Sequence, residues 1–218
     1  MWKKLSEAGI VRMPLGSYPF SERYGWVDDR YGLSWQLIFA GGSELPQRIT
    51  PVLLFVGRVC GKAEEGINFY ASVFKNSPGA KTREDTKAAI LARYGKGEEP
   101  DTEGTVRYAS FNLLGQEFGA MDSAREHKFA FNEAISFIVP CHTQEEIDYY
   151  WGSLSADPGA EQCGWLKDRY GLSWQVTPTI MQEMLGGKDQ EKIARVTRAF
   201  LQMKKFDIAA LKRAYEGS

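Results

Sequence analysis

An eight-residue string, DRYGLSWQ, occurs twice in this chain, at 29–36 and again at 168–175. Over the wider windows 25–37 and 164–176, ten of thirteen positions are identical, and the only exchange of charge is Asp28 for Lys167. Upstream, WKKLS at 2–6 corresponds to WGSLS at 151–155. Chance does not produce such a match, so the chain carries a partial internal duplication.

The spacing of the two copies indicates how the chain is organised. The copies lie 139 residues apart, which is the length of a whole domain rather than of half a domain. We therefore expect a complete domain over residues 49–180 and a helical extension over 181–218. Residues 1–42 are then the C-terminal end of a preceding equivalent domain, joined by a linker at 43–48. One helix and one hairpin cannot bury their apolar face alone, so this segment needs a partner surface.

Local patterns predict the elements. In each copy, Asp followed three residues later by Gly predicts a type I turn between two strands, and Pro14, Gly16 and Pro19 predict a loop before the first hairpin. Further strands are expected at 49–56, 105–113, 116–122 and 133–141. Helices are expected at 1–8 and 63–74, after the caps Thr143 and Asp207, and from Asp189 onward. Residues 88–94 fit either a strand or a helix. The mixture predicts an α+β fold with mixed or antiparallel sheets.

Composition excludes several classes of function. The chain is 43% apolar and 25% charged with a formal net charge of −1, which is typical of a soluble globular protein without a field that attracts nucleic acid. No apolar run is long enough to cross a membrane. Three cysteines far apart in sequence favour unpaired thiols in a reducing cytoplasm.

Several stretches carry a resemblance to a known family. ITPVLLFVG, CGKAEEGINFYASVF, GQEFGAMDS, FNEAISFIVPCHTQEEIDYYWGSLS, QCGWLKDRYGLSWQVTP and MKKFDIAALKRAYEG resemble the PhnB-like branch of the vicinal oxygen chelate superfamily, which includes glyoxalases and bleomycin-resistance proteins. The resemblance implies two paired βαβββ modules, at about 49–125 and 130–180, with curved sheets around a cavity. It also implies a homodimer, in which residues 1–42 exchange between subunits or dock within the chain.

Members of this branch often carry the label 3-demethylubiquinone 3-methyltransferase, and the residues do not support that activity. Nucleotide-type methyl donors bind at a Gly-rich turn after the first strand of a parallel α/β sheet. Here the strand is followed by FVGRVCGKAEEG, whose glycines do not form a GxG turn.

Metal-dependent relatives are expected to place His and Glu side chains on strands that face the cavity. Matched position by position, the Glu of the last strand falls on Gln175, and on Gln36 in the first copy. The opening strands fall near Thr50–Pro51 and Glu133–Ala134, where no histidine stands, and His127 and His142 fit loop positions. We therefore expect no metal and no cofactor, with Glu133 and Gln175 as the alternative for a weakly bound metal.

The candidate ligand site follows from alternation along the closing strand. Ser173 and Gln175 share one face of it, either in the cavity or on a solvent-facing edge, and Trp165 forms a cavity wall or packs in the core. The predicted ligand-binding residues are Ser173, Gln175, Trp165, Glu133, Phe137 and Met121. Cys163 has no evident His or acid partner and is expected to be inert.

Two functions of different classes fit these expectations. The first is a metal-free protein that binds a small organic molecule between curved sheets. The second is a lyase, isomerase or dioxygenase of the same superfamily that uses a divalent metal through Glu133. The residues do not name the ligand and do not decide whether a reaction is catalysed.

Overall fold

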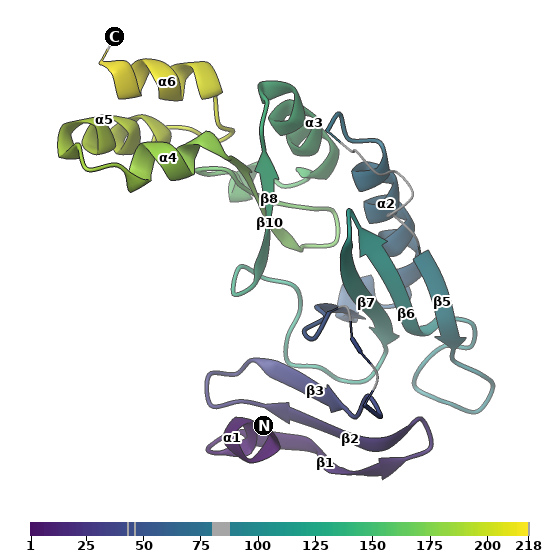
Figure 1. Cartoon of the computed structure of the whole chain (residues 1–218). Helices are drawn as coiled ribbons and strands as arrows, with labels where there is room; N and C mark the ends of the chain where they lie inside the picture. Colours follow the sequence, from purple (N-terminus) through teal and green to yellow (C-terminus); the bar gives the residue numbers. More distant parts are fainter. Residues whose placement is uncertain (43, 46, 80–87, 218) are drawn as a thin grey trace. The chain divides into compact units, whose positions relative to one another are not determined.

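A computed structural model describes residues 1–42, 44–45, 47–79 and 88–217 of the chain. It contains two compact units, Met1–Ile49 and Thr50–Ser218, which we call the first and second unit (Figure 1). The predicted linker at 43–48 falls partly outside the described residues. Strands and helices are both abundant and the sheets are open, so the α+β prediction is confirmed.

The first unit is one short helix and a three-stranded antiparallel sheet. Its elements are α1 (Trp2–Ser6), β1 (Ile10–Tyr18), β2 (Ser21–Asp28) and β3 (Ser34–Ile38), in the sheet order β1-β2-β3. The indole of Trp2 lies so close over Gly25 that a Cβ there would come within 2.5 Å of the ring. Glycine in β2 thus lets α1 pack directly on the sheet.

The predicted loop around Pro14 is wrong, because residues 10–18 form strand β1. The strand lies at the edge of the sheet, and its pairing with β2 shifts register between Met13 and Gly16. An edge strand with such irregularities tolerates a residue without an N–H, because no ladder hydrogen bond is then lost.

The second unit begins with a complete βαβββ module, the first module. Its elements are β4 (Val52–Val56), a 3-10 turn η1 (Gly57–Val59), α2 (Ala63–Lys75), β5 (Ala88–Arg93), β6 (Val106–Leu113) and β7 (Gln116–Ser123). The sheet order is β4-β7-β6-β5, with β4 and β7 parallel. The segment at 88–94, ambiguous by pattern, is therefore a strand. Its alternation of half-buried and exposed residues fits a sheet edge.

A buried carboxylate holds the start of α2 against this sheet. Asp122 on β7 accepts hydrogen bonds from the backbone N–H groups of Gly61, Ala63 and Val106 at 2.7–3.1 Å. It is 1% exposed, and burial raises its pKa despite these donors. One side chain thus fixes the helix start and two strands together.

The second module has the same pattern with one strand fewer. Its elements are β8 (Ser136–Cys141), α3 (Gln144–Leu154), a 3-10 turn η3 (Pro158–Ala160), β9 (Trp165–Lys167) and β10 (Ser173–Pro178). The sheet order is β8-β10-β9, with β8 and β10 parallel. The predicted capping box of Thr143 and Glu146 is confirmed. Only the turn η3 and short connections lie between α3 and β9, where the first module has its second strand.

Three helices follow β10: α4 (Ile180–Gly186), α5 (Gln190–Phe200) and α6 (Ile208–Glu216). The cap Asp207 is confirmed, a helix begins after Asp189 as predicted, and α4 stands at the start of the helical extension predicted over 181–218. Phe206, just before α6, lies against Gly164 at the start of the second hairpin, where a Cβ would come within 2.3 Å of its ring. The N–H groups of Cys163 and Gly164 donate to the carbonyls of Met203 and Lys204, so the extension is fixed to the second module.

The two modules meet at an aromatic core organised by Asp168. One carboxylate oxygen accepts from the N–H groups of Tyr170 and Leu172, and the other accepts from Trp174 Nε1 at 2.9 Å and from the Tyr70 hydroxyl at 2.8 Å. Tyr70 lies on α2, so this carboxylate links the first module to the second. The rings packed around the link are Phe69, Phe74, Phe111, Phe118, Phe137 and Trp174.

The first copy of the octapeptide repeats this turn without the link. Asp29 accepts from the N–H groups of Tyr31 and Leu33 and from Trp35 Nε1, as Asp168 does from the corresponding groups. Tyr31 is nevertheless 86% exposed, whereas its counterpart Tyr170 is 3% exposed. The eight residues thus encode the turn and its indole contact, and burial is added in the second unit by α2.

We expect Asp168→Asn to destabilise the second unit by on the order of 2–4 kcal/mol. The amide keeps one oxygen for the turn but directs an NH₂ group at the indole N–H and at the Tyr70 hydroxyl. Urea unfolding followed by near-ultraviolet circular dichroism measures the loss. The matched control is Asp29→Asn, which opposes no tyrosine and should cost much less. Equal losses for the two variants would contradict the role of the Tyr70 contact.

We also expect the pKa values of the two aspartates to lie on opposite sides of the ordinary value of 3.8, that of Asp29 below it and that of Asp168 above it. Hydrogen bonding by Trp35 lowers the pKa of Asp29, so its contribution to stability is present above 3.8 and is lost as the pH falls through the lowered pKa. Burial raises the pKa of Asp168, so protonation between 3.8 and the raised pKa favours the folded form at this site. The indole N–H signals in a ¹⁵N NMR titration, assigned with Trp35→Phe and Trp174→Phe, report each group. The Trp174 signal should shift at the higher pH, and the reverse order would refute this assignment.

Candidate functional site

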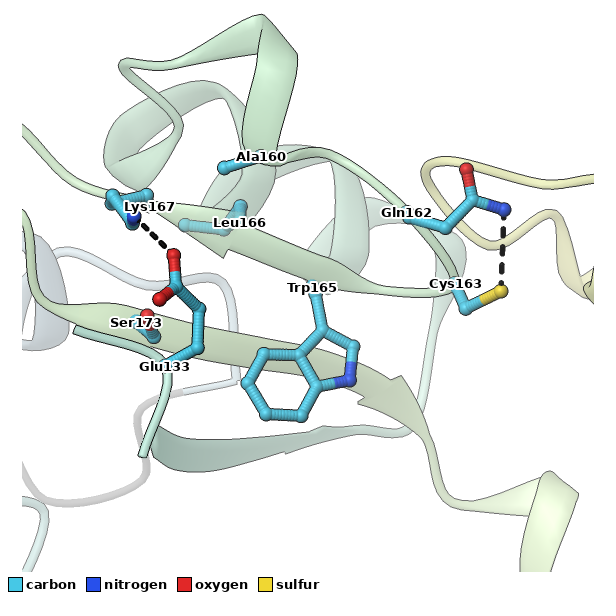
Figure 2. A pocket seen from close by; sticks show the side chains of 8 residues that line it. All are labelled: Glu133, Ala160, Gln162, Cys163, Trp165, Leu166, Lys167 and Ser173. Carbon is cyan, nitrogen blue, oxygen red and sulfur yellow. Dashed lines mark hydrogen bonds and ion pairs between the residues drawn. The ribbon is translucent and has the colours of Figure 1, made fainter. Parts of the chain in front are cut away.

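A pocket of about 480 Å³ opens on the second module beside β9 and β10 (Figure 2). Its walls come from the loop before β8, from the segment between η3 and β9, and from the two strands of the hairpin. The residues that line it are Glu133, Ala160, Gln162, Cys163, Trp165, Leu166, Lys167 and Ser173.

The register of the hairpin places the pocket side chains together. Ser173 pairs with Lys167 and Gln175 pairs with Trp165, and residues directly opposite each other in an antiparallel pair lie on one face. The residue between them on β10, Trp174, is 2% exposed and packs in the aromatic core. The alternation that fills the core therefore also directs Ser173, Trp165 and Lys167 to the opposite face.

Ser173 is the unusual member of this set. Its side-chain oxygen is buried and has no hydrogen-bond partner among the described residues, although the residue is only 1% exposed. A buried hydroxyl without a partner costs on the order of 1–3 kcal/mol, and native structures contain few of them. The pocket wall thus holds an unused hydrogen-bonding group.

A charged pair lies at the same wall. The ammonium of Lys167 contacts the carboxylate of Glu133 (Figure 2), and this contact lowers the pKa of Glu133. The side chain of Lys167 is 22% exposed, whereas that of Glu133 is 64% exposed. The lysine is therefore the more enclosed charge, and its partner is the one that solvent reaches.

Cys163 lines the pocket with its thiol held by neighbours. Its backbone adopts a left-handed conformation with φ 51°, and its sulfur lies 3.4 Å from Gln162 Nε2 and 3.6 Å from the carbonyl oxygen of Phe200. No histidine or carboxylate hydrogen bond to it is present in the described part of the chain. Elsewhere, burial raises the pKa of Cys141 to about 12, and burial also raises the pKa of Cys60.

Three of the six predicted site residues, Ser173, Trp165 and Glu133, line the pocket. Gln175 lies on the same face but donates to Ser136 Oγ at 2.8 Å. In the first copy, Gln36 instead accepts from Tyr24, whose position is taken by Cys163 in the second copy.

The structure places the other two predicted residues away from the pocket. Phe137 points to the opposite face and packs on Phe118 and Trp174. Met121 is half-buried on β7, paired with Leu54 in the first module. Phe137 does not reach the pocket because it lies on the other face of its strand, and Met121 does not because it belongs to the first module.

Residues that could hold a metal do not converge. Glu133 is paired with Lys167, and Gln175 is engaged by Ser136. His127 contacts Ser123 Oγ and His142 contacts Thr179 Oγ1, each outside the pocket lining. Over residues 1–42, 44–45, 47–79 and 88–217, no group of three or more His, Cys, Asp or Glu side chains is placed to bind a metal ion.

The sequence interpretation missed five of the residues that line the pocket: Ala160, Gln162, Cys163, Leu166 and Lys167. A signal for Lys167 was present, because it replaces Asp28 in the only charge exchange within the repeat. Gln162 and Ala160 lie in the connection that replaces a strand, and no pattern in the sequence marks them.

Residues 1–38 and 47–177 match the model of a protein family described as 3-demethylubiquinone-9 3-methyltransferase. The chain belongs to this family. The predicted resemblance to PhnB-like proteins is thereby confirmed, and the match in two stretches covers both copies of the octapeptide.

Three solved structures are similar to this family member. A PhnB protein from Bacillus cereus, named for 3-demethylubiquinone-9 3-methyltransferase, is 38% identical over 61% of this chain and all of its own length, with a TM-score of 0.48. A protein from Pseudomonas aeruginosa is 17% identical over 61% of this chain and 97% of its own, with a TM-score of 0.44. A protein from Staphylococcus aureus is 26% identical over 58% and 91%, with a TM-score of 0.24.

A search of curated proteins finds no match to the chain. Among the described residues, no helix has both the length and the apolar character needed to cross a membrane.

Proposed function

We propose that this PhnB-like protein binds a small organic molecule in the pocket beside Ser173, without a metal ion. The observation that carries the proposal is the buried Ser173 hydroxyl, which has no partner in the described part of the chain. A ligand group that bonds to it would offset the cost of burying it. The indole of Trp165 offers a flat apolar wall, and Lys167 with Glu133 offers charge, a combination typical of small-molecule sites.

The metal-dependent reaction of the superfamily gains no support from these contacts. Its anchor would be Glu133, but that carboxylate is bound to an ammonium group that an incoming cation would have to displace. The methyltransferase activity of the family's description is not part of the proposal either. β4 leads into the 3-10 turn Gly57–Val59 and, among the described strands, pairs with β7 at the edge of the sheet. This arrangement is unlike the parallel sheets that hold nucleotide-type methyl donors.

Blocking the pocket tests this function. A library of small organic molecules is screened against the full chain by ligand-observed NMR. We expect Ala160→Trp, which places an indole in the pocket wall, to abolish binding of the compounds that bind the unaltered protein. Ala209→Trp makes the same exchange on an exposed position of α6 and should leave binding intact. If no compound binds in a manner that Ala160→Trp prevents, the proposed function is wrong.

We also propose a second copy of the chain as the partner that covers the exposed face of the first unit. Tyr31 is 86% exposed and Leu33 is 38% exposed, whereas their counterparts Tyr170 and Leu172 are buried. The outer edge of β3 is unpaired within its sheet, whereas the corresponding edge of β10 pairs with β8. Exchange of residues 1–42 between subunits would cover both features.

Sedimentation velocity over a range of concentrations tests the dimer. We expect the unaltered chain to sediment as a dimer and Tyr31→Lys to shift it toward monomer, because a charge then enters the proposed interface. Leu201→Lys, which alters an exposed apolar residue of the second unit, serves as control and should have no effect. A monomeric unaltered chain would overturn the proposal.

A further inference from the structure

A Trp–Ser pair occurs at the same positions in both copies of the hairpin, but its two side chains are hydrogen-bonded to each other only in the first copy, among the described residues. In the first unit, Trp26 and Ser34 lie on one face of β2 and β3, and Trp26 Nε1 donates to Ser34 Oγ at 2.7 Å. Trp165 and Ser173 occupy the same positions in the same register of the second hairpin. There the indole does not bond to the hydroxyl, and Ser173 Oγ has no partner in the described chain.

The indole of the second copy is a wall of the pocket instead. In Figure 2 the nitrogen of Trp165 points away from Ser173. The pocket wall therefore contains a buried hydroxyl without a partner in the described chain, whereas the corresponding hydroxyl of the first hairpin accepts a hydrogen bond from a ring N–H. In the first hairpin, an aromatic ring N–H is thus the group that donates a hydrogen bond to the corresponding serine, Ser34.

The exchange of Asp28 for Lys167 within the repeat also affects which ligand charge the pocket favours. Asp28 binds Arg12 of β1 at 2.8 Å, whereas the ammonium of Lys167 at the corresponding position contacts an exposed carboxylate, that of Glu133. An ammonium at the pocket wall disfavours a cationic ligand. It can also bind a carboxylate that competes with Glu133.

We propose that the ligand is a flat heteroaromatic molecule that donates a ring N–H to Ser173 Oγ and carries a carboxylate toward Lys167. The inference rests on the proposed function and narrows it to a ligand class. Trp165 supplies the surface on which the ring lies, since aromatic rings stack in offset or edge-to-face geometries. The Ser173 hydroxyl supplies an oxygen that can accept the ring N–H, as Ser34 accepts that of Trp26 in the first hairpin.

A thermodynamic cycle tests the N–H contact on the full chain. The probes are indole-3-acetate and 1-methylindole-3-acetate, which differ by one methyl group on the ring nitrogen, and affinity is measured by isothermal titration calorimetry. We expect methylation of the probe and Ser173→Ala each to lower affinity about tenfold, as loss of one buried hydrogen bond does. Combined, they should cost little more than either alone, because both remove the same bond.

Matched controls separate this contact from general effects. Ser34→Ala removes the corresponding hydroxyl of the first unit and should leave both affinities unchanged. Tryptamine, which replaces the carboxylate by an ammonium, should bind at least tenfold more weakly than indole-3-acetate, and Lys167→Gln should reduce that difference.

Where the probes bind, either of two results would overturn the ligand class while leaving the pocket as a binding site. One is equal affinity for the methylated and unmethylated probes; the other is an independent, additive effect of Ser173→Ala. Failure of every indole probe alongside library compounds that Ala160→Trp excludes would likewise refute the ligand class alone. If neither a probe nor a library compound binds in a manner that Ala160→Trp prevents, the proposed function itself is wrong.

Discussion

The carboxylate of Asp168 is the buried hydrogen-bonding group that joins the two modules of the second unit. It accepts two N–H groups of its own turn, the indole of Trp174 and the phenol of Tyr70 on α2. These contacts place Trp174 in the core between the modules, and strand alternation then directs its neighbour Ser173 to the opposite face. The orientation of the pocket wall is thus a consequence of a buried hydrogen-bond network on the other side of the strand.

The first copy separates what eight residues specify from what their surroundings add. Asp29 makes the same turn and the same indole contact, yet Tyr31 stays exposed where Tyr170 is buried. The pKa values of the two aspartates differ accordingly: hydrogen bonds lower the pKa of Asp29, whereas burial raises the pKa of Asp168. Turn geometry is local chemistry, whereas burial and its electrostatic consequences belong to the tertiary structure.

The same division explains which features could be predicted from the sequence. The capping box at Thr143, the cap Asp207 and the repeated turns are confirmed, because each depends on residues within a few positions. Strand β1 was missed because Pro14 and Gly16 mark loops unless the strand lies at an irregular edge. In the site, Ser173 and Trp165 line the pocket and Phe137 packs in the core, whereas Ala160 comes to the pocket through a connection that no local pattern in the sequence marks.

The missing strand of the second module accounts for the position of the pocket. In the first unit, β1 covers the outer edge of β2 and supplies Arg12 to Asp28. In the second module, β9 is itself the edge, and the short connection through η3 leaves Ala160, Gln162 and Cys163 beside it. Without the neighbouring strand and its arginine, an aspartate at position 167 would face the pocket unpaired, and lysine there finds Glu133 instead. The second module thus lacks a counterpart of β1 and has Lys167 in place of an aspartate, and the candidate binding site lies at the sheet edge that results.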